Sequence, residues 1–201
     1  MLWRKIDNFW YYHKYKVLIA IFAIIAIIIA GSNNSGGEVD LEIAYVLGNN
    51  EIVLQNVDEK RALLESLIPG KDKEKGIISF VPLTPSRLEV EIVIGISQVL
   101  ILDKETLLPL LDYSVFEPLD NYVEKYNLDL NDFPEVKANS DETENTKVYA
   151  LPVKELNFLA EMGFPEDYYF TIRLPKENDS DEVMKNKNAH IILDYILKNR
   201  K

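Results

Sequence analysis

One unbroken apolar run divides this 201-residue chain into two unequal parts. The run extends from Val17 to Ala30, and as a helix its 14 residues are about 21 Å long, against about 30 Å for the hydrocarbon core of a bilayer. Residues 10–30 together number 21, which is enough to span a membrane. The added residues include side chains suited to the membrane interface, namely Trp10, Tyr11, Tyr12, Lys14 and Lys16.

The carboxyl side of the run distinguishes a retained anchor from a cleaved signal peptide. Signal peptidase requires small residues at positions −3 and −1, and cleavage after Ala30 would place Ile28 at −3. Residues 31–37, GSNNSGG, instead form a flexible polar linker. We therefore expect residues 10–30 to be a transmembrane helix. A cleaved signal peptide and a buried or interfacial helix are the alternatives.

The distribution of charge predicts the orientation of the chain in the lipid bilayer. Four basic residues precede the apolar run and none lies in the linker, so we expect residues 1–9 in the cytoplasm and residues 38–201 outside the cell. These outer residues carry 18 basic and 32 acidic side chains, a net charge of −14. So acidic a domain repels a phosphate backbone, and we expect no nucleic-acid partner.

The residue types that are rare or missing exclude several kinds of chemistry. The sequence has no cysteine, which excludes disulfides, thiol nucleophiles and thiolate metal sites. Its two histidines, His13 and His190, are too few for a histidine-rich metal site. No glycine-rich phosphate loop is present. Pairs of nearby carboxylates do occur, but an exposed, charged surface explains them without a catalytic role. We expect a protein that is not an enzyme and holds no cofactor, with His190 at or near the surface.

Residues 38–201 alternate short apolar runs with helical patterns. The expected strands are residues 39–47, 77–81, 99–102, 149–152 and 168–174. The expected helices begin near Asp58, Thr84, Asp103, Asp120, Glu155 and Asp179, and residues 127–147 are expected to form an exposed acidic excursion. This alternation predicts an α/β domain with a mostly parallel or mixed sheet of about five strands, flanked by helices.

Residues 84–95 fit two secondary structures. Alternation of Leu88, Val90, Ile92 and Ile94 with other residues has the period of a strand. Thr84 followed by Pro85 is typical of a helix N-terminus, since proline suits the first helical position. The local pattern alone is therefore compatible with either a strand or a helix.

Three segments of the outer domain stand out, at residues 99–123, 148–152 and 169–197. They resemble segments of bacterial extracellular solute-binding proteins of the two-lobed type II periplasmic class. Residues 99–123, VLILDKETLLPLLDYSVFEPLDNYV, resemble a family strand that carries an aspartate into a short helix and then an aromatic residue and a Pro-Leu-Asp turn. VYALP at 148–152 is similar to another family strand, and residues 169–197 resemble the strand and helix that return to the first lobe. The resemblance implies a helix at 84–95 and a single lobe, because only residues 127–147 stand where the family has a second lobe.

Two functions follow from these observations. The first is a membrane-tethered, non-catalytic module for interaction, sensing or an accessory role, which should show an exposed apolar patch. The alternative is a one-lobe solute-binding protein for a small polar ligand, alone or with a transporter. Ligands of open α/β sheets bind beyond the carboxyl ends of the strands, which here predicts Asn49, Asn50, Thr84 and Asp103. The same residues also suit turns and helix caps.

Overall fold

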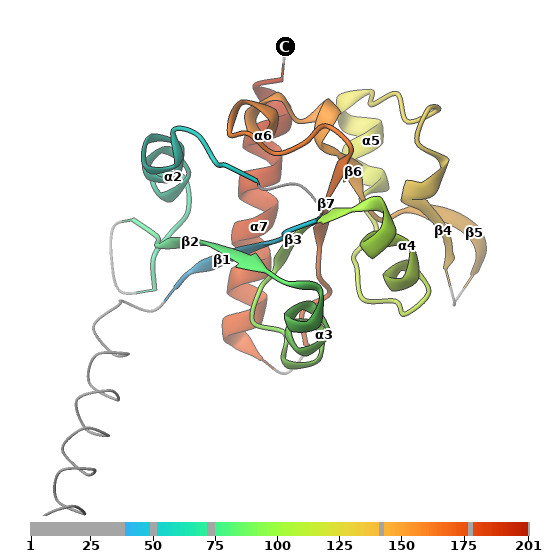
Figure 1. Ribbon diagram of the computed structural model, residues 1–201, viewed down its shortest axis with the longest axis horizontal. Coiled ribbons are helices and arrows are strands. Elements are labelled where there is room, and N and C mark those ends of the chain that lie inside the picture. Colours follow the sequence, from blue (N-terminus) through green and yellow to red (C-terminus); the bar gives the residue numbers. More distant parts are fainter. Residues whose placement is uncertain (1–38, 49–51, 72–74, 141–142, 177–178, 201) are drawn as a thin grey trace, which may run out of the picture. The chain divides into compact units, whose positions relative to one another are not determined.

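The computed structural model describes residues 39–200 apart from 49–51, 72–74, 141–142 and 177–178 (Figure 1). The expected transmembrane segment at 10–30, the linker at 31–37 and both Asn49 and Asn50 lie outside these residues. Among the helices that are described, none is long and apolar enough to cross a membrane. Residues 39–201 form one unit, and the account below concerns that unit alone.

A five-stranded mixed sheet lies at the centre of the domain, in the order β2-β1-β3-β7-β6. Its strands are β1 (Leu41–Val46), β2 (Ile78–Leu83), β3 (Val99–Asp103), β6 (Leu151–Pro152) and β7 (Tyr168–Ile172). Strand β1 pairs in parallel with β2 and β3, whereas β7 is antiparallel to β3 and to β6. The predicted α/β class and the five-stranded sheet are thereby confirmed.

The burial of the strands explains their order in the sheet. Val99, Leu100, Ile101 and Leu102 of β3 are all buried, as expected for a strand covered on both faces. Pro82 was expected to end the second strand but lies inside β2. It is accommodated there because β2 is an edge strand, where a missing N–H leaves no neighbouring strand unpaired.

Helices flank the sheet: α2 (Val57–Glu65), α3 (Pro85–Ile94), α4 (Lys104–Leu111), α5 (Asp120–Tyr126), α6 (Asn157–Glu161) and α7 (Ser180–Lys198). Helix α3 confirms the helical reading of residues 84–95, with Pro85 in its first turn and Gly95 at its end in the left-handed region, φ 77°. Helix α2 begins after Asn56, so Asp58 lies in its first turn and is not the predicted N-cap. In Figure 1, β1 and β2 cross in front of α7, the longest of these helices.

Residues 127–147 are not the exposed excursion that the acidic composition predicts. They contain a 3₁₀ turn (Pro134–Val136) and a hairpin of β4 (Lys137–Ser140) and β5 (Thr143–Val148). Leu128, Leu130 and Val136 are buried in the same core as the sheet. Around Asp129, the buried Leu128 and Leu130 alternate with exposed polar residues.

Candidate functional site

The carboxyl ends of the parallel strands meet at one edge of the sheet, as the sequence predicts. Asp103 ends β3 and lies opposite Tyr168, the first residue of β7. The hydroxyl of Tyr168 accepts a hydrogen bond from the backbone N–H of Gly48 at 3.2 Å, just after β1. A Cβ atom on Gly48 would lie 2.5 Å from that hydroxyl and 3.1 Å from Asp103 Oδ2. Thr84 follows β2 at the same edge.

Thr84 and Asp103 both serve as helix N-caps at this edge. Asp103 Oδ1 accepts a hydrogen bond from the backbone N–H of Thr106 at 2.8 Å, which satisfies one free donor of α4. Thr84 precedes α3, is exposed and makes no side-chain cap hydrogen bond. Asp103 therefore has a structural role as a helix cap. Ligand binding by Asn49, Asn50, Thr84 and Asp103 stays a prediction.

A polar pocket between α5 and α7 gathers titratable side chains that the sequence did not single out as a site. The α5–α7 pocket has a volume of about 390 Å³. Its lining residues are Glu117, Pro118, Asn121, Tyr122, Lys125, His190 and Asp194. Helix α5 supplies Asn121 and Tyr122, with Lys125 one turn later, and α7 supplies His190 and Asp194 at the i,i+4 spacing that places both on one face.

His190 is the centre of one half of this pocket. Its Nε2 lies 2.7 Å from Glu117 Oε2 and its Nδ1 lies 2.9 Å from the hydroxyl of Tyr122, whose ring stacks on the imidazole at 5.8 Å. Burial, with the charge of Asp194, raises the pKa of Tyr122 to about 12, so this hydroxyl keeps its proton at neutral pH. A neutral imidazole that donates from Nε2 to Glu117 accepts from Tyr122 at Nδ1 and satisfies both contacts.

Asp194 is the centre of the other half of the pocket. It accepts hydrogen bonds from Lys125 Nζ and from the hydroxyl of Tyr126, the latter at 2.8 Å. These two hydrogen bonds lower the pKa of the Asp194 carboxyl. Lys125 is 57% exposed, so this half offers one accessible cation beside a carboxylate. Such a constellation suits hydrogen bonding to a small polar ligand.

Two further pockets lie along the β4–β5 hairpin. The larger, of about 580 Å³, opens between α4 and the hairpin, and the smaller, of about 390 Å³, opens between α5 and the hairpin. Both are lined in part by Lys137 and Thr146. Glu135 of the larger pocket is already bound by the Tyr169 hydroxyl at 2.7 Å and by Lys104 at 3.0 Å. The α5–α7 pocket differs from these two in that it contains the histidine of the domain.

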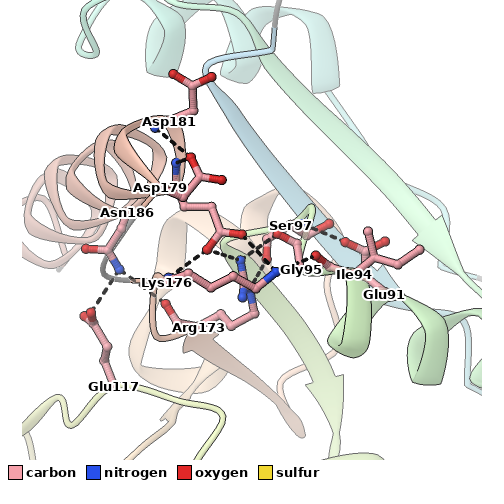
Figure 2. Close-up of polar contacts among 11 residues, drawn as sticks. Glu91, Ile94, Gly95, Ser97, Glu117, Arg173, Lys176, Asp179, Asp181 and Asn186 are labelled. Atoms are coloured by element: carbon pink, nitrogen blue, oxygen red, sulfur yellow. Dashed lines mark hydrogen bonds and ion pairs between the residues drawn. The ribbon is translucent and has the colours of Figure 1, made fainter.

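A buried ion pair lies at the opposite end of the sheet from Asp103 (Figure 2). Arg173 Nη2 is 3.2 Å from Glu182 Oε2, and the two side chains are only 6% and 11% exposed. Arg173 also donates to the carbonyls of Gly95 at 2.6 Å and Ser97 at 3.2 Å. The left-handed Gly95 is required here, because a Cβ atom would lie 2.6 Å from the guanidinium.

The buried pair is linked to the α5–α7 pocket through one amide. Asn186 Nδ2 donates to Glu117 Oε1 at 3.0 Å and to the Arg173 carbonyl at 3.3 Å (Figure 2). Glu117 therefore contacts both Asn186 and His190. This network holds the end of α3, the end of β7 and the first turns of α7 together.

An exposed apolar surface adjoins this network. We define the apolar surface as Val90, Val93, Ile94 and Ile96, at and just after the end of α3. Val93 is 79% exposed, Val90 54% and Ile94 53%. Lys176 Nζ donates to the Ile94 carbonyl at 3.1 Å beside this surface (Figure 2). Helix α3 thus carries apolar residues on its outer face as well as on the face of Leu88 that packs on the core.

Comparison with known proteins assigns no family to this fold and these sites. No family model matches the chain, and no curated protein is significantly similar to it. Within the described part of the chain, no group of three or more histidine, aspartate or glutamate residues is arranged to hold a metal ion.

Proposed function

We propose that this chain is a single-pass membrane protein whose α/β domain lies outside the cell and acts by interaction, not by catalysis. The apolar run at 10–30, its aromatic and basic flank and the polar linker at 31–37 support the tether. An interaction, sensing or accessory role requires a stable domain at the membrane with one surface available to a partner. The domain has both a buried core and such a surface.

The apolar surface is the observation that carries this proposal. A scattered exposed valine is ordinary on any protein, but Val90, Val93, Ile94 and Ile96 are exposed together at the end of one helix. The buried Arg173–Glu182 pair fixes α3 and α7 relative to each other, so the apolar surface is held in one arrangement. A prearranged apolar surface lowers the entropy that binding must overcome.

Site-specific photo-crosslinking in the full chain tests the proposal. A benzophenone amino acid replaces Val93 on the apolar surface or, as the matched control, Asp167, which is exposed beside the start of β7. Irradiation of membranes from the producing cell should give adducts at position 93 and few at position 167. Equal yields at both positions would mean that the apolar surface has no partner, and the interaction role would be withdrawn.

The resemblance to one lobe of a type II solute-binding protein is part of the same proposal. Support comes from β7, which returns antiparallel beside β3, and from α7, which packs back on β1 through a hydrogen bond from Asn188 Nδ2 to the Asp40 carbonyl at 3.0 Å. In this reading the hairpin of β4 and β5 takes the place of a second lobe.

Solute binding is the second candidate, and the α5–α7 pocket favours it. Thermal unfolding of the domain is followed against sugars, amino acids, peptides and metal ions. A ligand that binds only the folded form stabilises it by about 2.7 kcal/mol at a hundredfold excess over Kd. Lys125→Ala should remove a shift that arises in this pocket, whereas Lys104→Ala, outside it, should not. A shift that survives Lys125→Ala would place the ligand elsewhere.

A further inference from the structure

Three polar side chains of the α5–α7 pocket have hydrogen-bonding capacity that the protein does not fill. Asn121 is exposed, and its side-chain amide has no hydrogen-bond partner among the described residues. Lys125 Nζ has three N–H donors, of which Asp194 Oδ1 accepts one. Asp194 Oδ2 accepts no hydrogen bond from any residue that the structure describes, since Lys125 and Tyr126 both donate to Oδ1. The pocket therefore offers both donors and an acceptor to a ligand.

These groups come from two helices and meet at one pocket. Asn121 and Lys125 have the i,i+4 spacing on α5, which places their Cβ atoms about 5–6 Å apart on one helical face. Asp194 of α7 is in direct contact with Lys125 Nζ. The unfilled donors and the unfilled acceptor thus line the same space of about 390 Å³.

The charges of the lining do not favour a charged ligand. Glu117 and Asp194 carry two negative charges and Lys125 carries one positive charge. His190 adds none as the neutral imidazole that both of its contacts fit. An anion would have to displace Asp194 from Lys125, and it would be repelled by a domain with 18 basic and 32 acidic side chains at residues 38–201.

A cationic ligand is not favoured either. It would find the unfilled oxygen of Asp194 beside the Lys125 ammonium, which repels it. The two oxygens of Glu117 already accept hydrogen bonds from Asn186 and His190. A neutral ligand with its own donors and acceptors is therefore the class that the pocket suits.

Hydroxyl groups match this arrangement, because each donates one hydrogen bond and accepts others at the same time. Two hydroxyls on adjacent carbon atoms can bridge the ion pair, one accepting from Lys125 Nζ and the other donating to Asp194 Oδ2. The ion pair then stays intact. The amide of Asn121 can bind a further hydroxyl. Pro118 and the ring of Tyr122 belong to the lining and can pack against the C–H groups of such a molecule.

We propose that the α5–α7 pocket binds a neutral polyhydroxylated solute, a monosaccharide or cyclic polyol, through adjacent hydroxyls bound to Lys125 and Asp194. This inference rests on solute binding, the second candidate function, and specifies its ligand class. The pocket volume is near the lower end of the ~300–1,000 Å³ that is usual for ligand pockets, which fits a single sugar ring. Lys125 and Asp194 are 57% and 40% exposed, so water competes for both groups and we expect a Kd of about 1 mM.

Saturation-transfer difference NMR detects binding this weak and tests the proposal on the full chain. The chain is kept in lauryldimethylamine oxide, a detergent without a sugar headgroup, so that the detergent is not itself a ligand. The neutral probes are D-glucose, D-galactose, D-ribose and myo-inositol, and the charged probes are L-glutamate and putrescine. We expect saturable signals from at least one neutral probe and none from the two charged probes.

Two variants of exposed side chains test whether the binding occurs in this pocket. Lys125→Ala should raise the Kd of the neutral probe about tenfold or more and Asn121→Ala about threefold, because a hydrogen bond from a charged donor is stronger than one from an amide. The matched control is Lys104→Ala, which removes an ammonium that pairs with Glu135 outside this pocket. Its Kd should equal that of the unmodified chain.

The outcomes distinguish failure of the inference from failure of the function on which it rests. If L-glutamate or putrescine gives the signal in place of the neutral probes, solute binding stands and the neutral polyol is overturned. A sugar signal that Lys125→Ala leaves unchanged overturns the assignment to this pocket. If none of the probes binds, solute binding by the α5–α7 pocket is withdrawn together with the polyol.

Discussion

Glu182→Ala is the substitution whose effect on stability follows most directly from the structure. The Glu182 carboxylate accepts from the Arg173 guanidinium and, at 2.8 Å, from the backbone N–H of Lys176. Without it the guanidinium stays buried with only the Gly95 and Ser97 carbonyls as partners. The positive charge then lacks the carboxylate with which it is paired.

The size of the loss follows from the burial of the pair. Removal of one partner from a buried ion pair costs about 3–5 kcal/mol, since it leaves a charge without compensation. Arg173 keeps two carbonyl acceptors, so we expect the lower end, about 3 kcal/mol of unfolding free energy. The matched control is Asp181→Ala one residue earlier. Its pair with Lys71 is 40–49% exposed, and its loss should cost at most about 1 kcal/mol.

Urea unfolding of residues 39–201, followed by circular dichroism, measures both variants by linear extrapolation. Because both tryptophans, Trp3 and Trp10, precede this segment, tryptophan fluorescence is not a probe of it. The double variant Arg173→Met/Glu182→Leu should be more stable than Glu182→Ala, because it removes both charges from the interior. A Glu182→Ala domain as stable as Asp181→Ala would refute the reasoning that the pair is a buried link between α3, β7 and α7.

Three further predictions concern caps, backbone and pH. Asp103→Ala should lower the unfolding free energy by about 1 kcal/mol and Thr84→Ala by less than about 0.5 kcal/mol, because, of the two, only Asp103 makes a cap hydrogen bond. Equal losses in urea unfolding would contradict this prediction. Gly95→Ala should cost at least about 1–2 kcal/mol in the same assay, from left-handed strain and contact with the guanidinium, and a smaller loss would argue against this tight packing. Burial opposes ionisation of Glu135, but hydrogen bonds led by that from Tyr169 outweigh it and lower its pKa below the ordinary 4.5. Glu135 therefore stabilises the domain above pH 4.5, and this contribution is lost as the pH falls through the lowered pKa. In a pH series, the unfolding free energy of Glu135→Gln should fall less steeply in acid than that of the unmodified domain. Parallel curves for the two proteins would count against the prediction.

The elements that the sequence predicts well are those with local signals. Helix α7 was predicted from Asp179, which accepts from the backbone N–H groups of Asp181 and Glu182, whereas Thr84-Pro85 indicated α3 as one of two alternatives. The buried strand β3 followed from its continuous apolar run. Each of these signals acts over a few residues, and the tertiary structure agrees with it.

The order of the strands and the α5–α7 pocket depend on contacts that periodicity does not contain. No local pattern indicates that β7 pairs antiparallel with β3 across some 70 residues. His190 looked like an ordinary helix residue, yet its partner Glu117 lies 73 residues away in the sequence. The acidic composition of residues 127–147 did not indicate the hairpin of β4 and β5, whose pairing joins residues on either side of its turn.

One signal for the apolar surface was present in the sequence. Residues 88–94 carry more apolar side chains than one helical face needs, and this surplus made the segment look like a strand. Once the segment is known to be helical, Val90, Val93 and Ile94 must point away from the Leu88 face that packs on the core. The ambiguity of the pattern and the exposed surface thus have the same origin.

The most direct test of the account asks where the full chain resides and which side of the membrane holds its domain. The Asp167→Cys chain is produced in bacterial cells, treated intact with a membrane-impermeant maleimide and then fractionated with an alkaline carbonate wash. A retained anchor with an outer domain predicts full-length protein in the membrane pellet, labelled before lysis. A shortened chain in the soluble fraction, or labelling only after lysis, would contradict the account.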